Sequence, residues 1–314
     1  MSAFKKCTIL YNSLSGKKTF SIYRDTIVKM VSEKTGEMPE CFDVISIGKN
    51  NLPSFMEANP APFYLSIGGD GTFKEVVSSA LTLAETPTIA HLPLGSVNDV
   101  GNNFFLGKKT LINLDQILDG EPYKLDICSI NGETFNYFAG LGTIQASAYG
   151  TSQSLKNKLG FPALVMHITK ETFFPGTEFY NITYEVNGII KTVKTPFVFV
   201  GNTRNYAGFH KLIPTAKFDD KLFEVLIFDT TNIISMYRIL ADLVSGKKDL
   251  NEIKGLIYFQ TNNININLEK NPRWTWALDG EKYDNETREF QFDLSRNIDV
   301  LLPTESINKL KIKK

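Results

Sequence analysis

The chain has 314 residues, of which 42% are hydrophobic and 22% are charged, as in ordinary globular proteins. Lysine plus arginine equal aspartate plus glutamate at 34 each, so the overall charge argues against a nucleic-acid partner. Cys7, Cys41 and Cys128 lack C-x-x-C spacing, which argues against a disulfide framework and a zinc site. No segment resembles a signal peptide or a membrane span, so a cytoplasmic protein is expected.

The first third alternates short apolar runs with helix-like stretches. Strands are expected at 7–11, 42–46, 63–67 and 88–92, and helices at 19–34, 73–83 and near Asp115. Strands that alternate with helices predict a parallel sheet with helical crossovers. In such sheets, ligands bind outside the carboxyl ends of the strands.

From about Tyr123 the pattern changes to short strands. Asn131-Gly132 and Asn187-Gly188 each separate two apolar runs, which predicts two hairpins. Strands are expected at 125–130, 134–138, 179–186, 189–194, 197–201, 222–228, 255–260, 264–268, 288–293 and 298–302, and helices at 155–173 and 233–245. The expected organisation is an α/β domain over 1–126 and a C-terminal antiparallel β-sandwich-like domain over 127–296, with 297–314 returning to the first domain.

A glycine-rich segment, Gly68-Gly69-Asp70-Gly71-Thr72, follows the strand expected at 63–67. Glycines let the backbone approach a ligand closely, and Thr72 and Glu75 have the spacing of a capping box, which predicts that a helix starts at Thr72. A strand, a glycine turn and a helix N-terminus together form a cradle for an anion. Asp70 would repel phosphate unless a cation lies between them, as in enzymes that use Mg-nucleotides. The alternative is an ordinary tight turn, because Asp-Gly is a common turn pair.

Two further loops follow neighbouring strands. The segment Asn12-Ser13-Leu14-Ser15-Gly16-Lys17 is either a second phosphate-binding loop or a plain surface loop. In the segment 93–99, Ser96 and Asn98 can donate to phosphate or ribose and Asp99 adds a carboxylate, although these residue types also suit turns and caps. Three such loops after three parallel strands favour a functional interpretation.

Two acidic positions in or near the β-rich half have alternative interpretations. Asp126 is either a solvent-facing strand residue or joins Asp70 and Asp99 around a metal-bound water network. Three clustered carboxylates would require a divalent cation or a shared proton. Asp279-Gly280-Glu281 is either a turn or a site where Glu281 accepts the proton of a substrate hydroxyl, a role worth about 10²- to 10⁴-fold in rate. His91, His167 and His210 lack partners at informative spacing and are interpreted as structural.

The ordered set of motifs resembles the diacylglycerol kinase catalytic family, and in particular its soluble bacterial lipid kinases. The motifs are Gly-Gly-Asp-Gly-Thr, then Pro-x-Gly-Ser-x-Asn-Asp, then Asp-Gly-Glu, and the similarity covers essentially the whole chain, including 201–203, 207–214 and 216–220. The resemblance implies an ATP:lipid phosphotransferase. The nucleotide would lie on the loops of the first domain, and the active site would lie in the interdomain cleft.

The resemblance also implies roles for individual residues. Asp70, Asp99 and Asp126 match the aspartate network that organises the catalytic Mg²⁺, and Glu281 matches the proposed general base. Asp220, with the main-chain oxygens of Lys217 and Leu222, matches a structural cation site. One of Lys156 or Lys158 matches a lysine at the cleft. Nucleotide contacts are implied at Asn12, Ser13, Leu14, Ser15, Gly16, Lys17, Ser46, Gly68, Gly69, Asp70, Gly71, Thr72, Glu75 and Ser96.

Three departures from the family pattern concern nucleotide affinity. Ser13 stands where the family has proline, Lys74 stands where it has asparagine, and an arginine is missing from 100–103.

The expected function is transfer of the ATP γ-phosphoryl group to a lipid hydroxyl, foremost diacylglycerol, giving phosphatidate with the help of Mg²⁺. The protein would contact the inner membrane face peripherally to reach its lipid substrate, and a homodimer is an open possibility. One alternative is a kinase for a soluble substrate, of the NAD kinase type. The other is a catalytically silent regulator that binds lipid or nucleotide.

Overall fold

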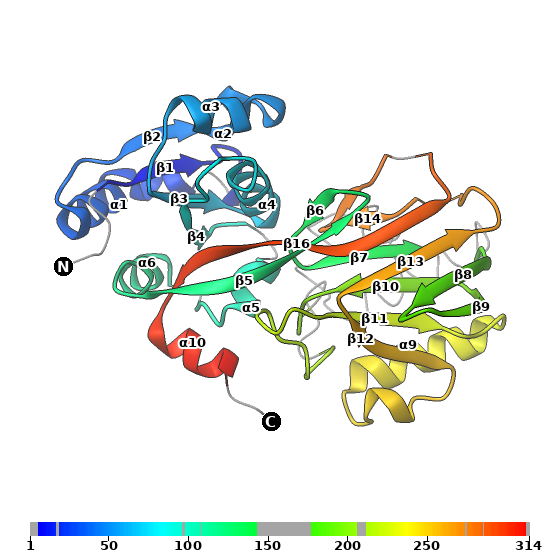
Figure 1. Cartoon of the computed structure of the whole chain (residues 1–314). Coiled ribbons are helices and arrows are strands. Elements are labelled where there is room, and N and C mark those ends of the chain that lie inside the picture. Colours follow the sequence, from blue (N-terminus) through cyan, green and yellow to red (C-terminus); the bar gives the residue numbers. More distant parts are fainter. Residues whose placement is uncertain are drawn as a thin grey trace. The chain divides into compact units, whose positions relative to one another are not determined.

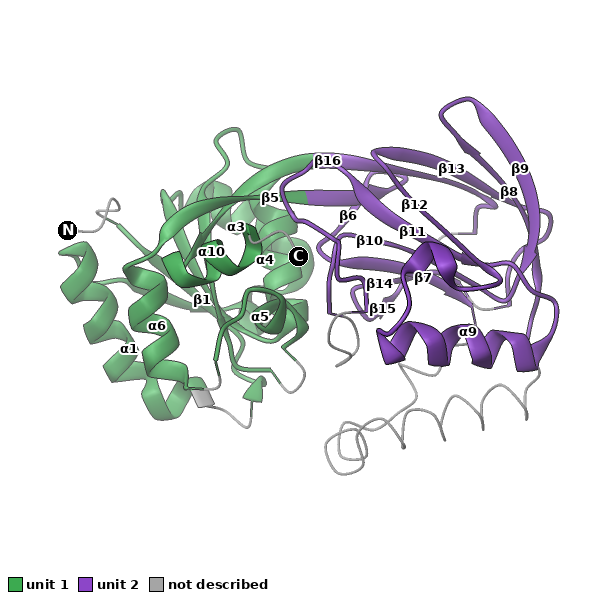
Figure 2. Cartoon of the chain, turned by 90° about the horizontal axis from the view of Figure 1, so that it is seen from below, with its two compact units in different colours: residues 1–126, 296–314 green, residues 127–295 purple. Residues whose placement is uncertain are grey.

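A computed structural model describes residues 6–16, 19–95, 98–107, 109–142, 177–205, 212–273, 275–284 and 286–311 (Figure 1). The chain divides into two compact units (Figure 2). Unit 1 comprises Met1–Asp126 and Arg296–Lys314, and unit 2 comprises Ile127–Ser295.

Unit 1 is built on a parallel sheet with the strand order β2-β1-β3-β4. These strands are β1 (Thr8–Tyr11), β2 (Glu40–Asp43), β3 (Phe63–Gly68) and β4 (Thr88–Pro93). Val300 of β16 (Glu289–Leu302) pairs in parallel with Ile89 of β4, so a strand from the end of the chain extends this sheet. The carboxyl ends of β1, β3 and β4 therefore lie at one edge.

Helices cover both faces of the sheet because side chains alternate along each strand. Helices α1 (Thr19–Thr35) and α6 (Thr110–Leu118) bury apolar side chains in one cluster with Leu65, Ile67 and Leu92. Helix α4 (Asp70–Ala80) meets the opposite face, where the ring of Phe73 lies 4.9 Å from that of His91. Shorter helices are α2 (Val44–Ile47), α3 (Leu52–Ala58), α5 (Asp99–Asn103) and α10 (Thr304–Lys311), with a 3₁₀ turn at Lys49–Asn51.

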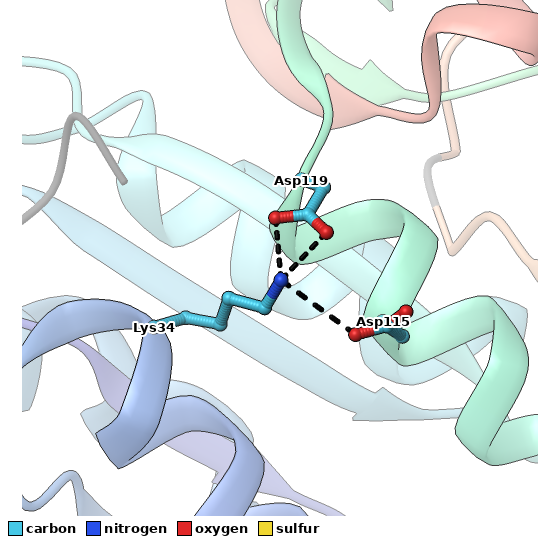
Figure 3. A network of polar contacts seen from close by, with 3 residues as sticks. All are labelled: Lys34, Asp115 and Asp119. Carbon is cyan, nitrogen blue, oxygen red and sulfur yellow. Dashed lines mark hydrogen bonds and ion pairs between the residues drawn. The ribbon is translucent and has the colours of Figure 1, made fainter. Parts of the chain in front are cut away.

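An ion-pair network joins the C-terminal end of α1 to α6 (Figure 3). Lys34 Nζ lies 2.5 Å from Asp119 Oδ1 and 3.7 Å from Asp115 Oδ1. Both carboxylates raise the pKa of Lys34, the hydrogen bond to Asp119 most strongly. The two aspartate side chains are more than half exposed, so solvent screening keeps the contribution to stability small.

His91 predicts how the stability of the protein depends on pH. The side chain is buried, its Nδ1 lies 3.3 Å from Ser66 Oγ, and burial lowers its pKa to about 3. Below pH ~6.5 the unfolded chain binds a proton here that the folded chain excludes. The free energy of unfolding should therefore fall as the pH is lowered from about 6.5, by at most ~1.4 kcal/mol per pH unit from this group.

Urea unfolding of the wild type and His91→Gln between pH 7 and 4.5 measures this effect. The variant is expected to show a shallower dependence on pH, because a neutral amide does not titrate. Equal slopes for the two proteins would contradict the prediction.

Unit 2 consists of two antiparallel sheets. One contains β13 (Asn263–Leu268), β8 (Tyr180–Val186) and β9 (Ile189–Thr195) beside β16, together with β5 (Glu121–Ile130) and β6 (Glu133–Phe135). The other has the order β12 (Leu256–Thr261), β11 (Phe223–Phe228), β10 (Phe197–Gly201), β7 (Phe138–Gly142), β14 (Ala277–Leu278) and β15 (Glu281–Lys282). Buried side chains of both sheets form one core, to which Ile266 and Val225 belong. The predicted α/β and antiparallel sandwich classes are confirmed.

The remaining described elements of unit 2 are α9 (Ile233–Ser245) and a 3₁₀ turn at Leu250–Glu252. Both predicted hairpin turns are present, and Asn131, Gly132, Asn187 and Gly188 all have positive φ, as a two-residue hairpin of this type requires. The helix expected at 155–173 lies outside the described residues. No helix in the described part of the chain is both long and apolar enough to cross a membrane.

Several strand predictions were wrong in their boundaries. The strand expected at 134–138 is divided between β6, which ends at Phe135, and β7, which begins at Phe138. The strand expected at 42–46 ends at Asp43, whose Oδ1 accepts from the backbone N of Ile45 at 3.1 Å and caps α2. The capping side chain offers this backbone N–H a partner outside the sheet, so the chain turns into a helix. The strands expected at 288–293 and 298–302 form the single strand β16.

Candidate active site

Helix α4 begins at Asp70, directly after the glycine turn that follows β3. Gly69 is its N-cap, and no side chain of the described residues caps it. Thr72 lies in the first turn, and its Oγ1 accepts a hydrogen bond from Asn12 Nδ2 at 3.2 Å. The predicted helix start at Thr72 was therefore wrong. The helix starts two residues earlier, at Asp70, and the Thr72 hydroxyl contacts the neighbouring loop. The uncapped N-terminus supports an anion cradle.

Gly68 and Gly95 are required by close approach, Gly68 to Thr72 within its own turn and Gly95 to the turn after β3. A Cβ on Gly68 would lie 2.4 Å from Thr72 Oγ1, and one on Gly95 would lie 2.6 Å from the Cα of Gly69. The backbone N of Leu94 donates to the carbonyl of Gly68 at 2.6 Å. The loops after β3 and β4 therefore contact each other through their backbones.

This contact predicts that Gly95→Ala impairs both stability and nucleotide binding. The new methyl group would meet the backbone of Gly69 and lie 2.8 Å from Asn98 Oδ1. Overpacking of this kind costs about 1–3 kcal/mol. Denaturant unfolding and titration with ATP measure the two effects.

Gly107→Ala is the matched control, because a Cβ there would lie 3.5 Å from Asn113 Oδ1, an ordinary contact. We expect this variant to behave as the wild type. A Gly95→Ala protein with unaltered unfolding and ATP affinity would show that the two backbones can separate without consequence.

The Asp70 carboxylate joins the same two loops. Its two oxygens accept from the backbone N of Asp99 at 3.1 Å and of Val100 at 2.9 Å. Burial raises the pKa of Asp70, although hydrogen bonds from these N–H groups oppose the shift. Asn98 adopts a left-handed conformation with φ 56° just before α5, and its Nδ2 donates to the carbonyl of Gly95 at 2.9 Å.

The loop after β1 is held by side-chain acceptors. Asn12 Oδ1 accepts from the backbone N of Leu14 at 2.9 Å, and Asp43 Oδ1 accepts from the backbone N of Ser13 at 3.2 Å. Sequence reasoning missed Asp43, and its place at the end of the neighbouring strand was the only signal. Ser46 is exposed on α2, with its Oγ 3.5 Å from Asp43 Oδ2.

The structure thus brings the three predicted loops together at the carboxyl edge of the sheet. Asn12 contacts Thr72, Gly69 lies against Gly95, and Asp70 accepts from Asp99. Lys17, Ser96, Lys156 and Lys158 lie outside the described residues. The nucleotide contacts implied for the loop residues remain predictions.

The other two carboxylates of the predicted Mg²⁺ network are buried. Asp99 and Asp126 are 3% and 2% exposed, so Asp126 is not a solvent-facing strand residue. Asp126 Oδ1 accepts from Asn297 Nδ2 at 2.8 Å. Within the described ranges, no three His, Cys, Asp or Glu side chains are grouped closely enough to hold a metal ion directly. The role of these aspartates in a Mg²⁺ network remains a prediction.

In unit 2, Asp279 is a structural acceptor at a hairpin turn. Its buried carboxylate accepts from the backbone N of Asn136, Tyr137 and Phe138 at 2.7, 3.0 and 3.1 Å. Asp279 and Gly280 have φ of 51° and 94° and connect β14 to β15, where Glu281 is exposed. The turn interpretation therefore holds for Asp279, and the Asp279 carboxylate fixes the backbone that carries Glu281.

The segment implied as a cation site forms a tight turn in unit 2. Asp220 Oδ1 accepts from the backbone N of Leu222 at 3.2 Å, and Lys221 between them has φ 59°. Burial raises the pKa of Asp220 and of the nearby Glu224. The cation site formed by Asp220 with the main-chain oxygens of Lys217 and Leu222 remains a prediction.

The chain is similar in sequence and in fold to known proteins. Residues 6–130 match the model of the diacylglycerol kinase catalytic domain. The chain is 28% identical over 308 residues to a diacylglycerol kinase of Staphylococcus aureus (strain JH9), covering 97% of this chain and 95% of the relative. A crystal structure of a diacylglycerol kinase from Bacillus anthracis str. Sterne matches with a TM-score of 0.75 and 18% identity, covering 98% of this chain and 100% of that chain.

A further structure from the same organism matches with a TM-score of 0.80 and 19% identity over 98% of both chains. At these identities the structures establish the shared fold. Residues 6–130 therefore belong to the diacylglycerol kinase catalytic domain family, a family of kinases, and the chain shares its fold with these bacterial structures along nearly its whole length.

Proposed function

We propose that this chain is an ATP-dependent lipid kinase that transfers the γ-phosphoryl group to a lipid hydroxyl, foremost that of diacylglycerol, giving phosphatidate. The observation that carries the proposal is the meeting of three loops at the carboxyl edge of β1, β3 and β4. Contacts from Asn12 to Thr72, from Gly69 to Gly95 and from Asp70 to Asp99 join them. Because the acceptor is a lipid, the reaction would take place at a membrane surface, to which the protein would bind peripherally.

The start of α4 is the proposed binding site for the nucleotide phosphates. Its backbone N–H groups and the glycine turn present donors and little steric bulk to an anion. Bound Mg²⁺ would neutralise charge that develops on the transferred phosphoryl group. Asp70, Asp99 and Asp126 fit such an ion through intervening water, because both oxygens of Asp70 already accept backbone hydrogen bonds.

Glu281 is the proposed general base. It would accept the proton of the lipid hydroxyl while the hydroxyl oxygen forms its bond to the γ-phosphorus and ADP leaves with the electrons of the broken bond. The Asp279 carboxylate holds the hairpin from which Glu281 projects. Proton acceptance by a positioned side chain contributes about 10²- to 10⁴-fold to a rate.

Transfer of label from γ-³²P ATP to diacylglycerol in mixed micelles tests the proposal. The wild type is expected to label the lipid, and Asp70→Ala and Glu281→Gln are expected to label it far more slowly. Lys34→Met is the control, because Lys34 pairs with Asp119 in an exposed ion-pair network. Equal labelling by all these proteins, or labelling of NAD in place of lipid, would contradict the proposal.

A further inference from the structure

Two buried asparagines in unit 2 have amide groups with no partner. Asn136 and Asn202 are 4% and 1% exposed, and the Nδ2 and Oδ1 atoms of both find no hydrogen-bond partner among the described residues, including each other. Buried polar side chains are nearly always hydrogen-bonded, because removing an amide from water is costly when nothing replaces the water. Two such amides, on residues whose backbones meet at Tyr137, indicate a ligand that the protein is built to receive.

The two asparagines lie at the end of the sheet that carries the Glu281 hairpin. The backbone N of Asn136 donates to Asp279 Oδ2 at 2.7 Å, and the backbone N of Asn202 donates to the carbonyl of Tyr137 at 3.0 Å. The backbone N of Asp279 donates in turn to the carbonyl of Phe138 at 3.0 Å. The ends of β7 and β10 and the β14–β15 turn are thus bound together within unit 2.

The chemistry of the amides selects the kind of ligand. Each amide has two N–H donors and one oxygen acceptor. A hydroxyl group can both donate to Oδ1 and accept from Nδ2, and an ester carbonyl can accept from the remaining N–H groups. An ionised phosphate only accepts, so it would leave both Oδ1 atoms without a donor. The site therefore suits an uncharged group that carries a hydroxyl.

We propose that Asn136 and Asn202 bind the hydroxyl and ester oxygens of a neutral acylglycerol and hold its hydroxyl beside Glu281. The inference rests on the proposed function and adds the two residues that bind and orient the lipid acceptor. Neither amide can take a proton, so both residues bind and orient the acceptor while Glu281 accepts the proton.

Equilibrium binding without turnover tests the proposal. The ligands are 1,2-dioctanoylglycerol and 1,2-propanediol dioctanoate, which has the same esters and no hydroxyl, each in mixed micelles. The wild type is expected to prefer the hydroxyl lipid by about 10- to 100-fold, because its amides stay unpaired with the other lipid. Asn202→Leu and Asn136→Leu are expected to lose this preference and to keep their affinity for ATP.

Thermal unfolding without lipid separates binding from a structural role. The leucine variants remove amides that have no partner in the free protein, so their melting temperatures are expected to equal or exceed that of the wild type. The control is Asn113→Leu in α6, because the side chain of Asn113 accepts from the backbone N of Gly107 at 3.1 Å and donates to its carbonyl. This control is expected to melt at a lower temperature and to keep the preference for the hydroxyl lipid. Alanine variants at both positions give the same comparison if a leucine protein fails to fold.

The outcomes distinguish this inference from the proposed kinase activity. The inference would be overturned if the leucine variants kept the preference for the hydroxyl lipid, or if the wild type showed no such preference. It would also be overturned if the leucine variants melted at a lower temperature, as Asn113→Leu is expected to do, because internal water would then satisfy the amides. A wild type that prefers the hydroxyl lipid but transfers no phosphate would support this site and reject the kinase. A wild type that phosphorylates lipid while both variants keep the preference would reject the site alone.

Discussion

Replacing Asp70 with asparagine is expected to slow phosphoryl transfer by at least ~10²- to 10³-fold, because the variant lacks a charge that the proposed site uses to organise its cation. The fold should persist, since the Asn Oδ1 can still accept from one of the N–H groups of Asp99 and Val100. Initial rates of lipid labelling measure the first effect, and denaturant unfolding with and without nucleotide measures the second.

The same substitution should alter how stability depends on pH in the ligand-free protein. Because burial raises the folded-state pKa of Asp70, the free energy of unfolding of the wild type falls as the pH rises from the usual carboxyl value through the raised one. The asparagine variant lacks this fall. Asp119→Asn, which alters an exposed ion pair in the same unit, is the control and should retain full activity. Wild-type rates in Asp70→Asn would contradict the role assigned to Asp70.

Replacing Asp279 with alanine is expected to lower the free energy of unfolding by about 3–5 kcal/mol, since three buried N–H groups lose their acceptor. Lipid labelling should also be lost, because the turn that carries Glu281 is no longer held. Urea unfolding and initial rates measure both effects.

Asp284→Ala is the matched control for this prediction. Asp284 follows the same hairpin, and its side chain is 76% exposed where it pairs with Lys282. The expected change in stability is within about 0.5 kcal/mol. Equal stability of Asp279→Ala and the wild type would show that the three N–H groups find other partners.

Local signals predicted much of the fold. The alternation of apolar runs with helical stretches predicts the parallel sheet of unit 1, because each crossover must return the chain to the same edge. The Asn-Gly pairs predict the two hairpins, because both residues must adopt positive φ. The meeting of the three loops followed from strand order alone, since parallel neighbours end at the same edge.

The sequence could not predict which distant group satisfies each polar atom. Thr72 has the spacing of a cap, yet its hydroxyl accepts from Asn12, which lies on another strand's loop. Asp279 lies two residues before Glu281 in sequence, but its partners are the backbone N–H groups around Tyr137. Such pairings depend on tertiary placement, which neither periodicity nor local propensity encodes.

The sequence also could not predict that the side-chain amides of Asn136 and Asn202 lack hydrogen-bond partners. In the sequence they are ordinary polar residues at strand ends, and only their burial without partners sets them apart. A site of this kind is found by accounting for the hydrogen bonds of each buried polar atom.

A crystal structure of the chain with Mg²⁺ and a non-hydrolysable ATP analogue tests the central claim most directly. We expect the phosphates to accept hydrogen bonds from the backbone N–H groups between Gly69 and Thr72, with the loop that begins at Asn12 also in contact. A nucleotide bound elsewhere, with these loops untouched, would contradict it.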